Sequence, residues 1–181
     1  MDILFDAPNI DQNAWGAING CEAASLLEGL HYQNKLTEVN YGEFLKMMPI
    51  DQSGNPYRGF GGSPYRNQSG KFEAIFVKPL SDWAAQYTTF RDISDLGIEA
   101  IYDSIRKGEP VVAYVTVHFE EPEIQRYPFG DVAINNHAVL VDGLTDSQVH
   151  VSDPIDGSYF LDKEKFAHIQ QSRKMALSLL K

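Results

Sequence analysis

Residues 19–27 read Asn-Gly-Cys-Glu-Ala-Ala-Ser-Leu-Leu and contain Cys21, the only cysteine of the chain. From residue 23 to residue 30, apolar side chains recur at the i, i+3, i+4 and i+7 positions that form one face of an α-helix. Asn19 and Gly20 are residue types that commonly stand just before the first turn of a helix. The stretch therefore predicts a helix that begins at Cys21.

The predicted place of Cys21 in the first turn has a chemical consequence. Free backbone N–H groups and the helix dipole stabilise a negative charge there, so we expect a lowered thiol pKa and a nucleophilic cysteine. The alternative is that Cys21 is a small buried core residue, as free cysteines often are. A histidine and an orienting acid or amide further along the chain would favour the nucleophile.

Composition limits the classes of protein to which the chain can belong. Its 181 residues suit a single domain over residues 1–181, and no apolar run is long enough to span a membrane. The net charge of −10 and the lack of a basic stripe argue against a nucleic-acid partner. One cysteine leaves no internal disulfide. The N-terminus lacks the features of a signal peptide, which predicts a cytoplasmic protein unless a leader has been removed.

The order of the expected elements is typical of an α+β fold, with N-terminal helices packed on a C-terminal antiparallel sheet. Helices are expected at 21–32, 41–48, 81–87, 98–106 and 162–171. Strands are expected near 90–93, 110–117, 137–143, 149–153, 159–161 and 174–179, and residues 3–10 are expected to form a short strand or an extended arm. The acidic segment 120–131 is expected to be irregular.

A loop rich in Gly, Pro, Ser and Asn fills residues 51–70, and loops of that length are usually functional or disordered. Its aromatic residues, with Trp15, are candidates for one wall of a substrate groove; they are Tyr57, Phe60 and Tyr65. Asp51, Ser53 and Asn55 alternate like the start of a calcium loop. Gly62 stands where that loop needs a bidentate glutamate, so the sequence predicts no metal, and no cofactor motif is present.

His137 begins one predicted strand and Asp153 ends the next, so both lie toward the open end of one hairpin. The strand register, which decides whether their side chains meet, cannot be derived from the sequence. Taken singly, His137 fits a core or surface residue and Asp153 fits a turn residue before proline. The competing bases lack a comparable strand-end acid; they are His31, His118, His150 and His168.

Cysteine, histidine and aspartate together form a recognised arrangement for acyl transfer. The imidazole of His137 would take the Cys21 proton and later protonate the leaving amine. Asp153 would hold the ring through its Nδ1–H and stabilise the imidazolium. The sequence thus favours Cys21 as nucleophile over Cys21 as a core residue.

Five blocks together resemble the papain-like bacterial cysteine peptidases, and more narrowly the stand-alone relatives of the double-glycine, bacteriocin-processing peptidases of cysteine-peptidase family thirty-nine. The blocks are Gln12 to Leu26, Gly54-Asn-Pro-Tyr-Arg-Gly-Phe-Gly-Gly-Ser-Pro64, Gly108-Glu-Pro-Val-Val112, Asn136-His137-Ala-Val-Leu-Val-Asp-Gly143 and Val151-Ser-Asp153-Pro-Ile-Asp-Gly157. They span nearly the whole chain.

The resemblance implies a papain-like fold and assigns a role to each matching residue. Cys21 would be the nucleophile, His137 the general base and acid, and Asp153 the orienting residue. Gln12, with the backbone N–H of Cys21, would form the oxyanion hole, and Asn13 is the alternative side-chain donor.

The resemblance also bears on partners and location. It implies a peptide or protein substrate and a protein that is extracellular or attached to the cell envelope if a leader is removed. Two alternatives to hydrolysis remain open. One is acyl transfer by the same three residues, and the other is a catalytically silent module that binds a peptide or a glycan.

Overall fold

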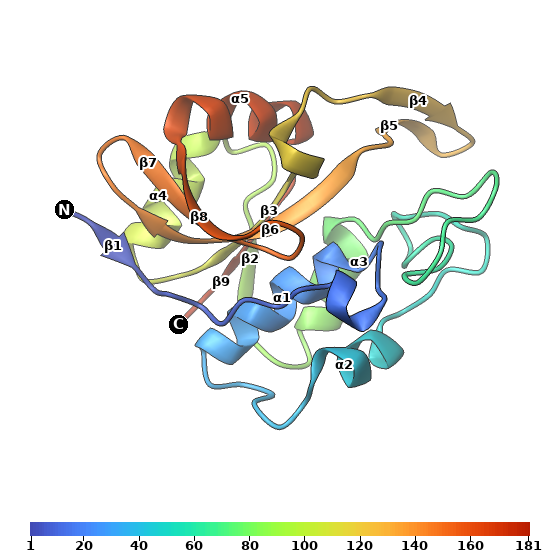
Figure 1. The fold of residues 1–181 in the computed structure, drawn as a ribbon, viewed down its shortest axis with the longest axis horizontal. Coiled ribbons are helices and arrows are strands. Elements are labelled where there is room, and N and C mark those ends of the chain that lie inside the picture. Colours follow the sequence, from blue (N-terminus) through green and yellow to red (C-terminus); the bar gives the residue numbers. More distant parts are fainter.

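The computed structural model describes all 181 residues, and an antiparallel sheet of seven strands forms its centre (Figure 1). Six strands follow the order β2-β9-β3-β6-β7-β8, and the short β1 pairs with the far end of β6. The strands are β1 (Ile3–Leu4), β2 (Phe90–Asp92), β3 (Val111–Thr116), β6 (Asn136–Leu144), β7 (Gln148–Asp153), β8 (Gly157–Asp162) and β9 (Ala176–Leu179). The last strand, β9, lies between β2 and β3.

Helices cover both faces of this sheet (Figure 1). The helices are α1 (Cys21–Tyr32), α2 (Tyr41–Met47), α3 (Val77–Ala84), α4 (Ile98–Arg106) and α5 (Lys163–Arg173), with short 3₁₀ turns η1 (Asn13–Trp15) and η2 (Val117–Phe119). Helices α1, α2 and α3 share one core cluster, and α4 and α5 share the other. This arrangement confirms the predicted α+β class.

The strand sequences explain why two cores form. Along β6, Ala138 and Leu140 belong to the core beneath α1, whereas Val139 and Val141 belong to the core beneath α4 and α5. Side chains of a strand alternate between its two faces, so an uninterrupted apolar run is stable only when both faces are covered. Every residue of β3 is buried for the same reason.

Three segments differ from the sequence-based expectation. The strand expected near residues 3–10 is confined to Ile3–Leu4. Helix α3 begins at Val77 rather than Ser81, because Pro79 falls in its first turn, where its missing N–H leaves no intrahelical bond unmade. The acidic segment is not irregular: Ile124–Tyr127 (β4) pairs with Gly130–Ala133 (β5) in a two-stranded hairpin.

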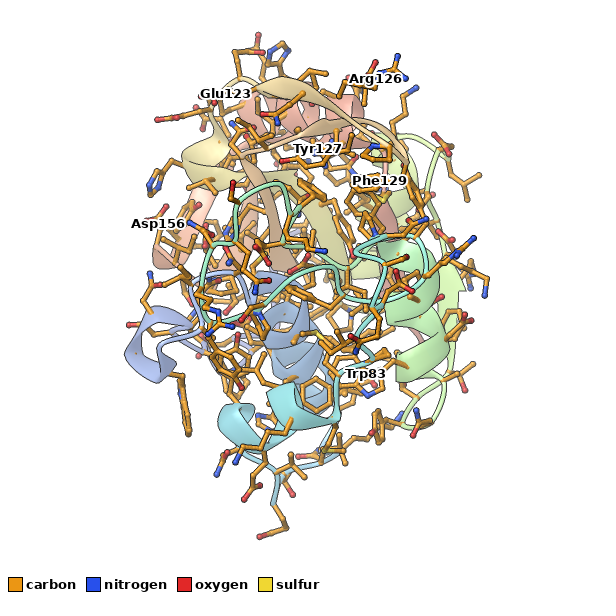
Figure 2. All side chains as sticks on the ribbon, turned by 90° about the vertical axis from the view of Figure 1, so that its right-hand side faces the viewer. Trp83, Glu123, Arg126, Tyr127, Phe129 and Asp156 are labelled. Atoms are coloured by element: carbon orange, nitrogen blue, oxygen red, sulfur yellow. The ribbon has the colours of Figure 1, made fainter.

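The β4–β5 hairpin packs on the long loop between α2 and α3. Phe72 of the loop lies 5.5 Å from Tyr127, and Tyr57 lies 6.4 Å from Phe129, between ring centroids. Figure 2 shows Tyr127 and Phe129 above this loop. Aromatic packing therefore orders a loop that carries almost no regular secondary structure, and the loop becomes one side of the candidate site. None of the five helices has the length and apolar character needed to cross a bilayer.

Candidate active site

Cys21 occupies the first residue of α1, as predicted, and the backbone around it is closely packed. Gly20 is the N-cap residue, and its carbonyl accepts a 2.6 Å hydrogen bond from the Tyr41 hydroxyl. A Cβ at Gly20 would lie 2.0 Å from the Tyr41 hydroxyl oxygen, so only glycine fits. The Cys21 N–H has no intrahelical acceptor because it belongs to the first helical residue. The helix start thus leaves one backbone donor free beside the thiol.

His137 and Asp153 form a buried pair at the open end of the β6–β7 hairpin. His137 Nε2 lies 2.8 Å from Asp153 Oδ1, and the two side chains are 1% and 0% exposed. Both residues lie at the open end of the hairpin as predicted, and the strand register, which could not be derived from the sequence, brings their side chains together. The expected ring nitrogen was wrong: Nε2 contacts Asp153, which leaves Nδ1 as the nitrogen available to a thiol.

Asp153 has enough donors around it to remain ionised. Its Oδ1 also accepts a hydrogen bond from the Ile155 N–H, and its Oδ2 accepts one from the Tyr159 hydroxyl at 2.9 Å. Burial by itself would raise the pKa of Asp153, but the hydrogen bond and charge of His137 and these further donors hold it below its usual value. A carboxylate in this state holds the imidazole ring and stabilises its protonated form.

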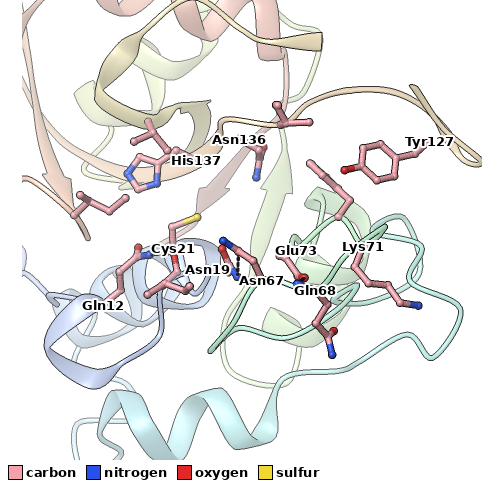
Figure 3. Close-up of a pocket in the computed structure, with 15 residues that line it drawn as sticks. Gln12, Asn19, Cys21, Asn67, Gln68, Lys71, Glu73, Tyr127, Asn136 and His137 are labelled. Atoms are coloured by element: carbon pink, nitrogen blue, oxygen red, sulfur yellow. Dashed lines mark hydrogen bonds between the residues drawn. The ribbon is translucent and has the colours of Figure 1, made fainter. Parts of the chain in front are cut away.

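Gln12 is buried beside Cys21, whereas Asn13 is exposed and does not line the site. The 3₁₀ turn η1, which begins at Asn13, lies between Gln12 and α1, and the Gln12 side chain lies beside Cys21 (Figure 3). Its Nε2 donates to the Ile18 carbonyl at 2.9 Å, and its backbone N–H donates to the Pro154 carbonyl. One further Nε2 hydrogen remains, so Gln12 fits the side-chain donor of an oxyanion hole better than Asn13 does.

The Cys21 thiol does not have the predicted environment. Its Sγ donates to Glu22 Oε1 at 3.1 Å, and it makes no hydrogen bond to His137. In Figure 3 the sulfur points into the cavity and away from the His137 ring. Burial, with the charge and hydrogen bond of Glu22, raises the Cys21 pKa well above its usual value. The expectation of a lowered pKa from the helix terminus was therefore wrong for this resting arrangement.

A cavity of about 300 Å³ opens over Cys21, His137 and Gln12 (Figure 3). Its lining is largely polar and includes Asn19, Asn67, Gln68, Lys71, Glu73, Tyr127 and Asn136. The aromatic residues expected along the groove are elsewhere. Phe60 is fully buried, Tyr57 packs on Phe76, and Trp15 packs on Tyr41. The loop does supply a wall, but through the polar stretch around residues 67–73.

Acid partners are more common among the other histidines than the sequence suggested. His150 pairs with Asp142 in the same hairpin, His118 pairs with Asp156, and His168 pairs with Glu121. Asp142 lies inside β6, and Asp156 and Glu121 lie between elements, so none of these pairs has an acid at the end of a strand as His137 does. His137 differs from them because it is the one histidine that borders the cavity with Cys21.

Three residues of the site were missed in the sequence. Glu22 looks like a polar residue on an exposed helix face, yet nearly all of α1 is buried. Asn136 has its Oδ1 held by Arg173 Nη2 at 2.8 Å, and its amide nitrogen points into the cavity (Figure 3). Tyr159 reaches Asp153 across the β7–β8 pair. The sequence feature that could have identified Glu22 is its position directly after Cys21.

The geometry supports chemistry at the Cys21 thiol. No group of three or more His, Cys, Asp or Glu residues is arranged to hold a metal ion. A buried imidazole–carboxylate pair, a thiol at a helix start and two N–H donors border one cavity. These are the parts needed to form and hydrolyse an acyl-enzyme.

The sequence is similar to a known protein family and to a bacterial relative. A family model for the Peptidase C39 like family matches residues 4–174. The chain is 28% identical over 170 residues to the uncharacterised protein YvpB of Bacillus subtilis (strain 168), a match that covers 85% of this chain and 64% of YvpB. The chain therefore spans less than two thirds of the length of that relative.

Two solved structures share the fold. A Bacillus anthracis protein classed as a C39-like peptidase has a TM-score of 0.86 and 24% identity, with 100% of this chain and 98% of that chain covered. A double-glycine motif protease from an AMS/PCAT transporter, crystallised with a leader peptide, has a TM-score of 0.58 and 14% identity. That match covers 98% of this chain and 94% of the other.

Proposed function

Because the chain belongs to the Peptidase C39 like family, we propose that it is a cysteine peptidase that hydrolyses amide bonds in a peptide or protein. The observation that carries the proposal is the shared cavity: Cys21 borders it at a helix start, and the buried His137–Asp153 pair borders it from the sheet. The AMS/PCAT relative was crystallised with a leader peptide, which supports a peptide as the class of substrate.

The reaction proceeds in two stages. After the thiol turns toward His137, Nδ1 takes its proton, and the thiolate attacks the substrate carbonyl. The Gln12 amide and the Cys21 N–H stabilise the oxyanion. The imidazolium then protonates the leaving amine, and a water activated by His137 hydrolyses the acyl-enzyme. Asp153 keeps the ring oriented in both stages.

Alkylation and cleavage together test this proposal. We expect iodoacetamide to modify Cys21 rapidly at pH 6 to 7, and His137→Ala to slow that reaction at least tenfold because the ion pair is lost. In a peptide library, the native protein should generate products, Cys21→Ala should generate none, and His137→Ala should lower the rate about 10²–10⁴-fold. A Cys21 that reacts no faster than a cysteine in the unfolded chain, in both proteins, would overturn the proposal.

A second candidate is a module that binds a peptide or a glycan without cutting it. The observation that favours it is the thiol itself, which is bonded to Glu22 rather than to His137. Peptide binding by the native protein, with no product and no acyl-enzyme over long incubation, would support the module. Acyl transfer is separated from hydrolysis by adding an amine and identifying the product by mass spectrometry.

We also propose a cellular location. We place the protein outside the cell or at the cell envelope if a leader is removed, and in the cytoplasm otherwise. Fractionation of cells that produce the full-length protein, with N-terminal sequencing of the mature form, distinguishes the two.

A further inference from the structure

Glu22 joins the Cys21 thiol to the backbone of the segment that precedes α3. Its Oε1 accepts the thiol hydrogen at 3.1 Å, and its Oε2 accepts the Ile75 N–H at 2.9 Å. The residue is 1% exposed, so both hydrogen bonds are buried away from bulk water. The hydrogen bond to the Ile75 N–H uses only one carboxyl oxygen of Glu22. A purely structural role for Glu22 therefore does not explain why its other oxygen contacts Cys21 Sγ.

The groups around Glu22 come from four elements. Cys21 lies on α1, His137 on β6, Tyr41 on α2 and Tyr114 on β3. Among them His137 can carry a positive charge, and both tyrosine hydroxyls already donate to carbonyls. Burial raises the pKa of Glu22 to about 7, although the Ile75 and Cys21 hydrogen bonds and the His137 charge oppose that rise. Glu22 thus changes its charge within the ordinary working range of pH.

We propose that Glu22 is a positioning residue that accepts the hydrogen of the resting Cys21 thiol when ionised and, when protonated, donates a hydrogen bond to the thiolate of the reactive form. This inference rests on the proposed peptidase function and deepens it. It adds a second proton-binding group at the nucleophile, beside His137.

The two arrangements differ by one proton. In the resting form the hydrogen is on sulfur, Glu22 is a carboxylate, and His137 is neutral. In the reactive form the thiol hydrogen has moved to His137 Nδ1, and Glu22 has gained a proton from solvent. The new Glu22 O–H then donates to the thiolate, so the direction of that hydrogen bond reverses. Acidification favours the reactive form because it supplies the extra proton.

The pH dependence of Cys21 alkylation in the native protein tests the switch. An ordinary thiol reacts faster as pH rises, because more of it is thiolate. We expect the opposite between pH 7 and pH 8, a fall in the iodoacetamide rate that approaches about tenfold per pH unit. A rate that rises steadily through this range would overturn the proposal.

Glu22→Gln imitates the protonated form with little change of shape. The glutamine carbonyl can accept the Ile75 N–H while its amide nitrogen donates to the sulfur. We expect the fall above pH 7 to disappear, so that at pH 8 this variant reacts about tenfold faster than the native protein. Glu28→Gln is the matched control, because Glu28 is a second fully buried glutamate of α1 that binds the Ile10 N–H rather than the thiol. Its profile should follow the native one.

The outcomes separate this proposal from the proposed function. If Cys21 reacts rapidly and depends on His137, but Glu22→Gln and the native protein share one profile, the Glu22 switch is wrong and the peptidase proposal stands. If Cys21 is unreactive in every variant, the peptidase proposal fails first. Should Glu22→Gln not fold, the ¹³C resonance of the Glu22 carboxyl in the native protein replaces it. Alkylation of Cys21 should shift that titration, and an unchanged titration contradicts the switch.

Discussion

The Gln12 side chain lies beside Cys21 with one amide hydrogen not committed to Ile18. An oxyanion donor acts only when a carbonyl oxygen gains negative charge, which happens in peptide cleavage and not in alkylation of a thiol. We therefore expect Gln12→Ala to lower kcat for peptide hydrolysis about 10²–10³-fold while the iodoacetamide rate at pH 6 changes less than about twofold.

Asn13→Ala is the matched control for that experiment, because Asn13 is the neighbouring amide and is exposed outside the cavity. It should leave both rates near the native values. Equal losses of cleavage and alkylation in Gln12→Ala would mean that Gln12 supports the local structure rather than the oxyanion.

Single residues also show which features of the site can be predicted from the sequence. Cys21, His137 and Asp153 were identified because their residue types and chain order are chemically restrictive. The ring nitrogen that contacts Asp153 and the thiol contact with Glu22 were not predicted correctly. Those depend on rotamers chosen by packing between segments far apart in the chain, such as Glu22 against Ile75.

Helix α1 is the element around which the site is built, and its middle is packed against the sheet. A Cβ at Gly29 would lie 2.5 Å from Leu179 Cδ1 and 3.3 Å from Leu140 Cδ1, both fully buried side chains. Alanine would favour the helix by about 1 kcal/mol, but overpacking costs about 1–3 kcal/mol. We expect overpacking to outweigh helix propensity, so Gly29→Ala should lower the free energy of unfolding by up to about 2 kcal/mol in urea titrations.

Gly42→Ala in α2 separates helix propensity from packing. Its Cβ would lie 3.0 Å from Trp15, which is 49% exposed and free to shift. This variant should be neutral or slightly more stable. A Gly29→Ala protein as stable as the native one would show that the α1–sheet contact is looser than the distances indicate.

Elements were predicted best where local pattern decides them. Helices α1 and α4 begin and end where their periodicity indicated, although α4 buries one face and α1 is buried nearly all round. The β4–β5 hairpin was missed because its outer strand is mostly exposed and lacks an alternating pattern. Its aromatic contacts with Phe72 and Tyr57 of the long loop stabilise it instead.

The whole molecule carries a pH dependence that follows from its buried acids. Burial raises the pKa of Glu28 well above its usual value, although the Ile10 N–H opposes this. Glu28 in the unfolded chain loses its proton at lower pH than in the folded chain, so the native protein loses stability as pH rises between the two pKa values. Glu22, whose pKa is raised to about 7, acts in the same direction.

Glu28→Gln removes the contribution of Glu28 to the pH dependence of stability. We expect the stability of the variant relative to the native protein to increase as pH rises from 4 to 7, by about 1.4 kcal/mol for each unit by which the Glu28 pKa is raised. Urea unfolding at several pH values measures it. Glu164→Gln, an exposed substitution on α5, should show no such trend. A relative stability of Glu28→Gln that is constant with pH would contradict the expectation.

The sequence by itself determined the α+β class, most helices and strands, and the residue types of the candidate site. Helical periodicity, strand alternation and turn chemistry involve neighbours along the chain, so they can be recognised without a structure. The tertiary structure alone decided that Gln12 rather than Asn13 lies beside Cys21, that Nε2 of His137 contacts Asp153, and that Glu22 holds the thiol. Each of these depends on how separate segments pack against one another, which no local pattern encodes.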